Sequence, residues 1–265
     1  MPGFTLKACI FTLILTLSAG QTGRADDTLR FYFLPLPGLL GEDGKSGSLG
    51  KAIAEIGNRS GIRFQLVHSN QNRLIRELKG DAPAAGAPQL GAMVAERFGQ
   101  NMRLSVPLVF RWDFVFVRSG QTIPHAIEDI RKKILVVSPM TTLPPPLNDI
   151  RETLTVLETH SDASALLLLS KGRADIWIND ETTTMAAKEE AGVSNIHYDA
   201  EQPFYVWPAH IVYSAQVEAT VINRIDEAIL SMVRDDSLKD LMPQNFASRY
   251  ERYLSGGSPH ESAFP

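Results

Sequence analysis

Short apolar runs alternate with amphipathic stretches along most of this 265-residue chain. The first two runs are residues 29–34 and 62–67. Between them, Leu49, Ile53 and Ile56 recur at the three- and four-residue spacing of one helix face. This alternation predicts strands joined by helices, and therefore an α/β fold whose sheets are largely parallel.

The same pattern begins again near Ser119, which predicts a second α/β unit. A long, mostly apolar strand is expected at 108–118, just before this unit, and a returning strand at 204–213. A spacer rich in Ala, Gly and Pro is expected at 81–88, and a helical tail from Val221. The remaining expected elements of the second unit are strands at 133–138, 154–157, 174–179 and 195–198 and helices at 127–130, 163–170 and 181–191.

The N-terminus has the features of a secretory signal. The apolar run at 8–19 follows Lys7 and is too short to cross a bilayer, but it suits the hydrophobic region of a signal peptide. Small residues follow, and Gly23-Arg24-Ala25 offers a cleavage site before Asp26, so residues 1–25 are expected to be a signal peptide; a buried N-terminal helix is the alternative. Cleavage removes Cys9, the sole cysteine, and predicts a soluble periplasmic protein without membrane insertion.

Composition and motif spacing exclude several function classes. The chain is 44% hydrophobic and 21% charged, which is normal for a globular protein. Its net charge of −4 argues against the basic surface that a nucleic-acid binder needs. No two of the six histidines have metal-site spacing, and no G-x-S-x-G motif occurs. No metal, cofactor or nucleic-acid partner is therefore expected.

Three stretches carry a resemblance to a known family. They are Gly91–Arg97 with the following Ser105-Val-Pro107, Leu135–Thr142, and Leu169–Asp180 with its Gly-Arg-x-Asp segment. Their order and spacing resemble those of the bacterial extracellular solute-binding proteins of family 3, the periplasmic amino-acid-binding proteins of ABC importers. The resemblance implies a two-lobed periplasmic-binding-protein-like fold of type II, with a ligand cleft between lobes that two crossover strands join.

The resemblance also implies how the chain is divided between the lobes. The first lobe is expected to be discontinuous, comprising residues 26–118 and 210–265. The second lobe is expected at 119–209.

The resemblance assigns ligand contacts to both lobes. Arg97 would hold a ligand carboxylate, because a planar guanidinium can bind both of its oxygens. Asp180 would accept the ligand ammonium. Hydroxyl and main-chain groups would complete the site, supplied by Thr141, Thr142, Gly91 and Ala92.

Each of these assignments has a structural alternative. Arg97 could be a solvated helix residue, and Asp180 could cap the helix expected at 181–191. Thr141 and Thr142 could be turn residues ahead of the prolines that follow.

The expected function is capture of a small polar ligand, amino-acid-like or an organic acid, by lobe closure and its delivery to an ABC permease. The protein would act as a monomer and without catalysis. Two alternatives use the same fold. One is an accessory protein with a protein partner, suggested because Leu36–Leu39 replaces the family's Pro-Pro-Phe. The other is a cyclohexadienyl-dehydratase-like enzyme with Asp180 or Glu181 as its acid.

Overall fold

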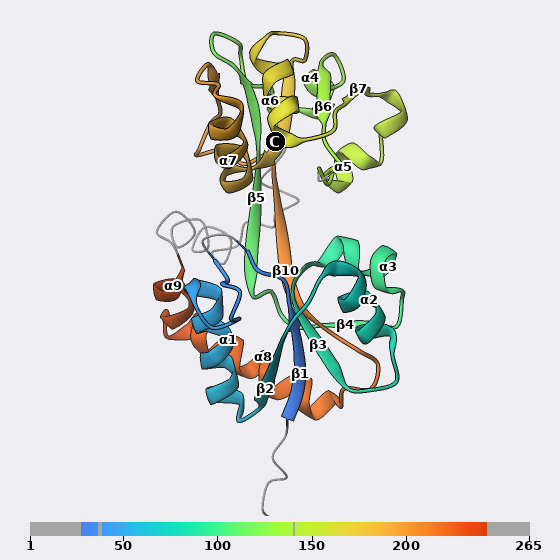
Figure 1. Cartoon of the computed structure of the whole chain (residues 1–265), viewed down its shortest axis with the longest axis vertical. Helices are drawn as coiled ribbons and strands as arrows, with labels where there is room; N and C mark the ends of the chain where they lie inside the picture. The colour runs from blue at the N-terminus through green and yellow to red at the C-terminus, as the bar shows by residue number, and fades with distance from the viewer. Residues whose placement is uncertain (1–27, 37–38, 140, 243–265) are drawn as a thin grey trace, which may run out of the picture.

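Two lobes joined by two long strands make up the computed structural model, which describes residues 28–36, 39–139 and 141–242. The strands β5 (Val109–Arg118) and β10 (Tyr205–Tyr213) run from one lobe into the other (Figure 1). The predicted signal peptide lies outside the described residues. Among those described, no helix is long and apolar enough to cross a membrane.

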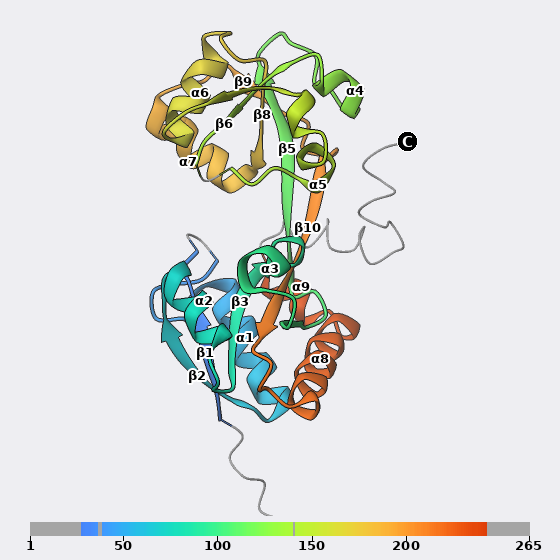
Figure 2. The same ribbon diagram turned by 90° about the vertical axis from the view of Figure 1, so that its right-hand side faces the viewer.

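The first lobe is built on three parallel strands. Alternate side chains of β1 enter two different cores: Phe31 and Phe33 pack with α1 and α8, whereas Tyr32 packs with α2 and α3. Helices therefore cover both faces of this part of the sheet (Figure 2). The elements of this lobe are β1 (Thr28–Phe33), α1 (Gly47–Ser60), β2 (Arg63–His68), α2 (Gln71–Lys79), β3 (Ala84–Leu90), α3 (Gly91–Phe98), β4 (Arg103–Leu104), α8 (Ala219–Arg234) and α9 (Ser237–Leu241).

The second lobe repeats this arrangement on a smaller scale. Its three parallel strands carry α6 and α7 against one core, and α4 and α5 contribute to another. Its elements are α4 (Ile127–Ile130), β6 (Ile134–Val137), α5 (Pro145–Asn148), a 3-10 turn (Arg151–Thr153), β7 (Thr155–Glu158), α6 (Asp162–Ser170), β8 (Ile176–Asp180), α7 (Glu181–Ala191) and β9 (Ile196–His197).

The crossover strands connect the two sheets edge to edge. The strand order is β2-β1-β3-β10-β5-β8-β6-β7, and β10 is antiparallel to both β3 and β5. Leu90, the last residue of β3, is opposite Ala209. Asp180, the last residue of β8, is opposite Asp113. The short segment 110–112 of β5 therefore lies between the carboxyl ends of the two parallel sets.

One side of β5 is a row of buried aromatic rings. Phe110, Trp112, Phe114 and Phe116 are each at most 6% exposed and belong to one core cluster that reaches into both lobes. Because side chains alternate along a strand, Arg111 and the fully buried Asp113 project from the opposite face.

Most predicted elements are confirmed, including the helices at 127–130 and 181–191 to the residue. The spacer predicted at 81–88 is wrong, because β3 occupies most of it. Small residues fit there for a steric reason: a Cβ on Gly86 would stand 2.5 Å from the Leu74 side chain and 3.2 Å from the Tyr32 carbonyl oxygen. The predicted lobe boundaries at 118/119 and 209/210 stay predictions, since β5 and β10 run through both lobes.

Candidate functional site

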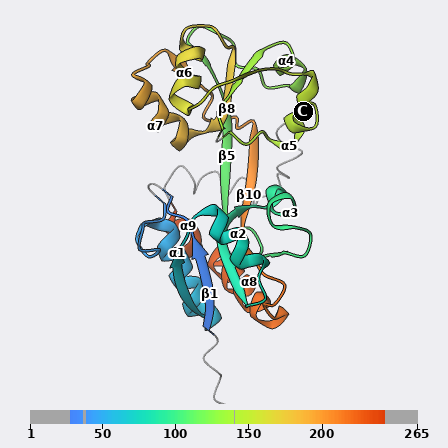
Figure 3. The ribbon, with the colours of Figure 1, turned by 45° about the vertical axis from the view of Figure 1, so that its right-hand side comes forward.

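The carboxyl ends of the parallel strands of both lobes are directed at the middle of the crossover. In open α/β sheets, ligands bind outside the carboxyl ends of the strands. In the first lobe this edge leads into α3, and in the second it leads into α7 and the loop before α5. The helices α3 and α5 occupy the facing ends of the two lobes beside β10 (Figure 3).

A network of polar groups centred on Arg111 occupies this point. Arg111 Nε donates to Asp113 Oδ1 at 2.7 Å, and Arg111 Nη2 donates to Asn179 Oδ1 at 2.6 Å. The other oxygen of Asp113 accepts from the indole nitrogen of Trp207 at 2.6 Å. Arg111 Nε also lies 3.8 Å from Asp180 Oδ2. The network therefore joins both crossover strands to β8 of the second lobe.

Burial and charge act in opposite directions on this network. Burial raises the pKa of Asp113, although Arg111 and the Trp207 N–H favour the ionised carboxylate. Burial alone would lower the pKa of Arg111, but the charges of Asp113 and Asp180 raise it, with a further contribution from Asp162. Arg111 therefore stays charged in a position where three carboxylates influence it.

Asp180 has a clear structural role. Its Oδ1 accepts from the backbone N–H of Thr183 at 2.8 Å, which caps the N-terminus of α7. The alternative considered from the sequence is therefore observed. The ion pair with Arg111 involves the other oxygen, Oδ2, which makes no hydrogen bond to any described residue. A ligand role for Asp180 stays a prediction.

Thr141 belongs to a hydroxyl-rich turn at the carboxyl end of β6. Its Oγ1 accepts from the Ser138 backbone N–H at 2.9 Å and lies 3.1 Å from Ser138 Oγ. Ser138 in turn donates to Asp162, the first residue of α6. The charge of Asp162 also contributes to raising the pKa of Arg111. Thr142 is half-buried.

Gly91 and Ala92 begin α3 at the facing edge of the first lobe. A Cβ on Gly91 would stand 2.9 Å from His210 Nε2, so a side chain there would displace the imidazole. His210 Nδ1 is 2.7 Å from the Ser105 carbonyl oxygen, which can only accept, so Nδ1 carries a proton. Burial lowers the pKa of His210.

Arg97 lies on the last turn of α3 and is half-buried. It makes no hydrogen bond or ion pair with any residue that the structure describes, and no contact joins it to Asp180. Its assignment as the carboxylate-binding residue stays a prediction.

Arg111 was missed by sequence reasoning, although the signal was present. The sequence predicts a mostly apolar strand at Leu108–Arg118. Two opposite charges two residues apart within such a strand lie on one face, and buried charges are rare unless paired. That spacing alone indicates a buried ion pair.

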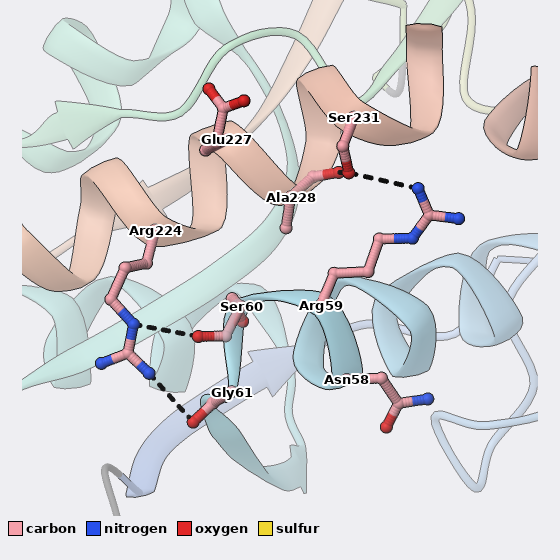
Figure 4. Close-up of a pocket in the computed structure, with 8 residues that line it drawn as sticks. All are labelled: Asn58, Arg59, Ser60, Gly61, Arg224, Glu227, Ala228 and Ser231. Atoms are coloured by element: carbon pink, nitrogen blue, oxygen red, sulfur yellow. Dashed lines mark hydrogen bonds between the residues drawn. The ribbon is translucent and has the colours of Figure 1, made fainter. Parts of the chain in front are cut away.

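A surface hollow elsewhere has a structural explanation. It lies where α1 ends against α8, and Arg224 donates to the carbonyl oxygens of Ser60 at 2.9 Å and Gly61 at 3.1 Å (Figure 4). Arg59 bonds Ser231 at 3.1 Å and Asp235 at 2.6 Å across the same contact. These bonds satisfy carbonyl groups at a helix C-terminus and hold two helices together.

Within the described ranges, no group of three or more His, Cys, Asp or Glu side chains is placed to hold a metal ion.

Comparison with known proteins identifies the fold. No family model matches the sequence, and no curated protein matches it. The structure is similar to the L-cystine solute receptor of Neisseria gonorrhoeae in its unliganded open conformation, with a TM-score of 0.60 and 16% identity over 84% of this chain and 94% of that chain.

It is also similar to the glutamate-bound GluR0 ligand-binding core of Nostoc punctiforme, with a TM-score of 0.56 and 17% identity over 83% and 99% of the two chains. An ancestral arginine-binding protein bound to arginine has a TM-score of 0.55 and 15% identity, over 81% of this chain and 96% of that chain. The chain therefore has the two-lobed periplasmic-binding-protein fold of type II, as the sequence predicts.

Proposed function

We propose that this protein is a periplasmic solute-binding protein that captures a small polar ligand between its lobes and delivers it to an ABC permease. The observation that carries the proposal is the convergence of Leu90 and Asp180, at the carboxyl ends of β3 and β8, on a short crossover segment. This is the position where open α/β sheets bind ligands.

The similar structures support an amino-acid-like ligand, because they include a cystine receptor, an arginine-binding protein and a ligand-binding core in complex with glutamate. An organic acid is the other ligand class consistent with the proposal. The ligand contacts proposed from the sequence are Arg97, Asp180, Thr141, Thr142, Gly91 and Ala92.

Lobe closure supplies the mechanism. A ligand that contacts both lobes binds the closed form better than the open form, and it shifts the population toward closure. β5 and β10 are the connections about which this movement would occur. The protein would act as a monomer and bind without chemical change to the ligand.

Two measurements test this function. Mass spectrometry of the protein purified from its native periplasm should detect a small bound molecule. A thermal-shift screen of amino acids and organic acids should then raise the melting temperature, because a ligand at a hundredfold excess over its Kd adds about 2.7 kcal/mol. A screen in which no amino or organic acid stabilises the protein would contradict the proposal, and conversion of prephenate or arogenate would point to an enzyme instead.

A further inference from the structure

One edge of the Arg111 guanidinium donates no hydrogen bond to a described residue. A guanidinium has five N–H donors, and those on Nε and one on Nη2 are taken by Asp113 and Asn179. Nη1 donates to no described residue. It is also not fully buried, because it does not belong to the fully buried side-chain atoms without a hydrogen-bond partner. Nη1 is therefore accessible, and the side chain as a whole is 24% exposed.

The carboxylate of Asp180 also has one oxygen that is free to accept a hydrogen bond. Asp180 Oδ1 is occupied by the Thr183 N–H, but Oδ2 accepts no hydrogen bond among the described residues and lies 3.8 Å from Arg111 Nε. Asp180 Oδ2, which accepts no hydrogen bond from a described residue, therefore lies close to the same guanidinium, 3.8 Å from its Nε atom.

An α-amino acid presents matching groups, because its carboxylate and its ammonium are attached to one carbon atom. Laid against this pair, the carboxylate would accept from Nη1 and Nη2 of Arg111, and the ammonium would donate to Asp180 Oδ2. Two parallel N–H donors to one carboxylate make a strong, directional contact. An amine or a carboxylic acid alone would satisfy only half of the pair.

We propose that Arg111, on the crossover strand, is the residue that binds the ligand carboxylate, with Asp180 binding the ammonium of the same amino acid. This inference rests on the proposed function and narrows its ligand class to α-amino acids. It leaves Arg97 to contact the rest of the ligand.

The position of Arg111 gives the contact a second consequence. Asp113 connects Arg111 to Trp207 on the other crossover strand. A ligand held by Arg111 therefore acts on both strands that join the lobes, where a small rotation moves one whole lobe against the other.

The test uses the L-amino acid that most stabilises the wild type among arginine, glutamate, glutamine and cystine, measured by titration calorimetry. Arg111→Lys keeps the charge beside Asp113 but removes the free guanidinium edge, and it should weaken binding at least 30-fold. Arg118→Lys, at the far end of the same strand, is the matched control and should bind within threefold of wild type. The amine lacking the carboxylate and the acid lacking the amino group should each bind at least 30-fold more weakly than the amino acid.

The variant pair Arg111→Gln/Asp113→Asn removes both charges and repeats the test if Arg111→Lys does not fold. Binding by either folded variant within threefold of wild type, or a larger loss in Arg97→Lys than in Arg111→Lys, would overturn the inference. If the wild type binds an organic acid but no amino acid, the inference fails while the proposed function stands. If it binds neither, both fail.

Discussion

Trp207 donates its indole N–H to Asp113 at 2.6 Å, and this bond connects the two strands that join the lobes. Asp113 is fully buried on β5, and its other oxygen accepts from Arg111. This carboxylate thus adds a side-chain link between β5 and β10, which also pair along their backbones.

Replacing Trp207 should be more costly than replacing a comparable buried tryptophan. Trp207→Phe removes a hydrogen bond to a charged acceptor, with an expected loss of about 1.5–3 kcal/mol. Trp177→Phe removes a 3.1 Å bond to the neutral Thr184 hydroxyl, with an expected loss of about 0.5–1.5 kcal/mol. Both changes replace the same side chain with the same smaller one. The difference between their free energies of unfolding, measured in urea, therefore reports the effect of the acceptor's charge. Equal losses would show that Asp113 is not ionised.

Removing Arg111 alone should leave an unpaired buried carboxylate. Arg111→Gln is expected to lower the free energy of unfolding by about 3 kcal/mol, at the lower end of the range for buried pairs because Arg111 is partly exposed. The double variant with Asp113→Asn should lose less than the two single losses together, since neither charge then remains unpaired. Additive losses in a double-mutant cycle would rule out the coupling.

The two roles of Asp180 can be separated. Asp180→Ala removes the cap of α7 and should cost about 1 kcal/mol, as should Asn70→Ala, which removes the cap of α2. Asp180→Ser keeps a capping oxygen and should be nearly as stable as wild type, yet it should lose ligand affinity. Retained affinity in a stable Asp180→Ser protein would limit Asp180 to capping.

His210 should make stability depend on pH in a known direction. Burial lowers its pKa below the ordinary 6.5, so the unfolded chain binds the proton first as the pH falls. Its contribution is complete above 6.5 and is lost as the pH falls toward the folded-state pKa, by up to about 1.4 kcal/mol per pH unit. Asn at 210 can donate to the Ser105 carbonyl without titrating. Urea unfolding between pH 7.5 and 5.5 should therefore show a steeper loss for wild type than for His210→Asn, and parallel curves would exclude this role.

The alternation of apolar runs and amphipathic helices predicted most of the fold, because hydrophobic periodicity reports burial directly. It located α7 exactly, since Asp180 both ends a strand and caps the helix that follows. It failed at β3, where close packing around Gly86 leaves no room for the larger residues that usually mark a strand.

The candidate site was predicted less well, for a physical reason. Site geometry depends on which strands become neighbours, and only the fold brings Arg111 on β5 next to Asn179 and Asp180 on β8. Thr141 lies at the carboxyl end of β6, as its place after the predicted strand implies, and its ligand role stays a prediction.

Small-angle X-ray scattering with and without the ligand tests the central claim most directly, because that claim is that a small ligand closes two lobes about β5 and β10. The radius of gyration should fall when the amino acid identified by thermal shift is added to saturation. When the amino acid is added at only a few times the wild-type Kd, the radius should fall much less for Arg111→Lys than for the wild type, because an affinity at least 30-fold weaker leaves most of the variant unliganded. Identical scattering of the free and the saturated wild-type protein would contradict the account.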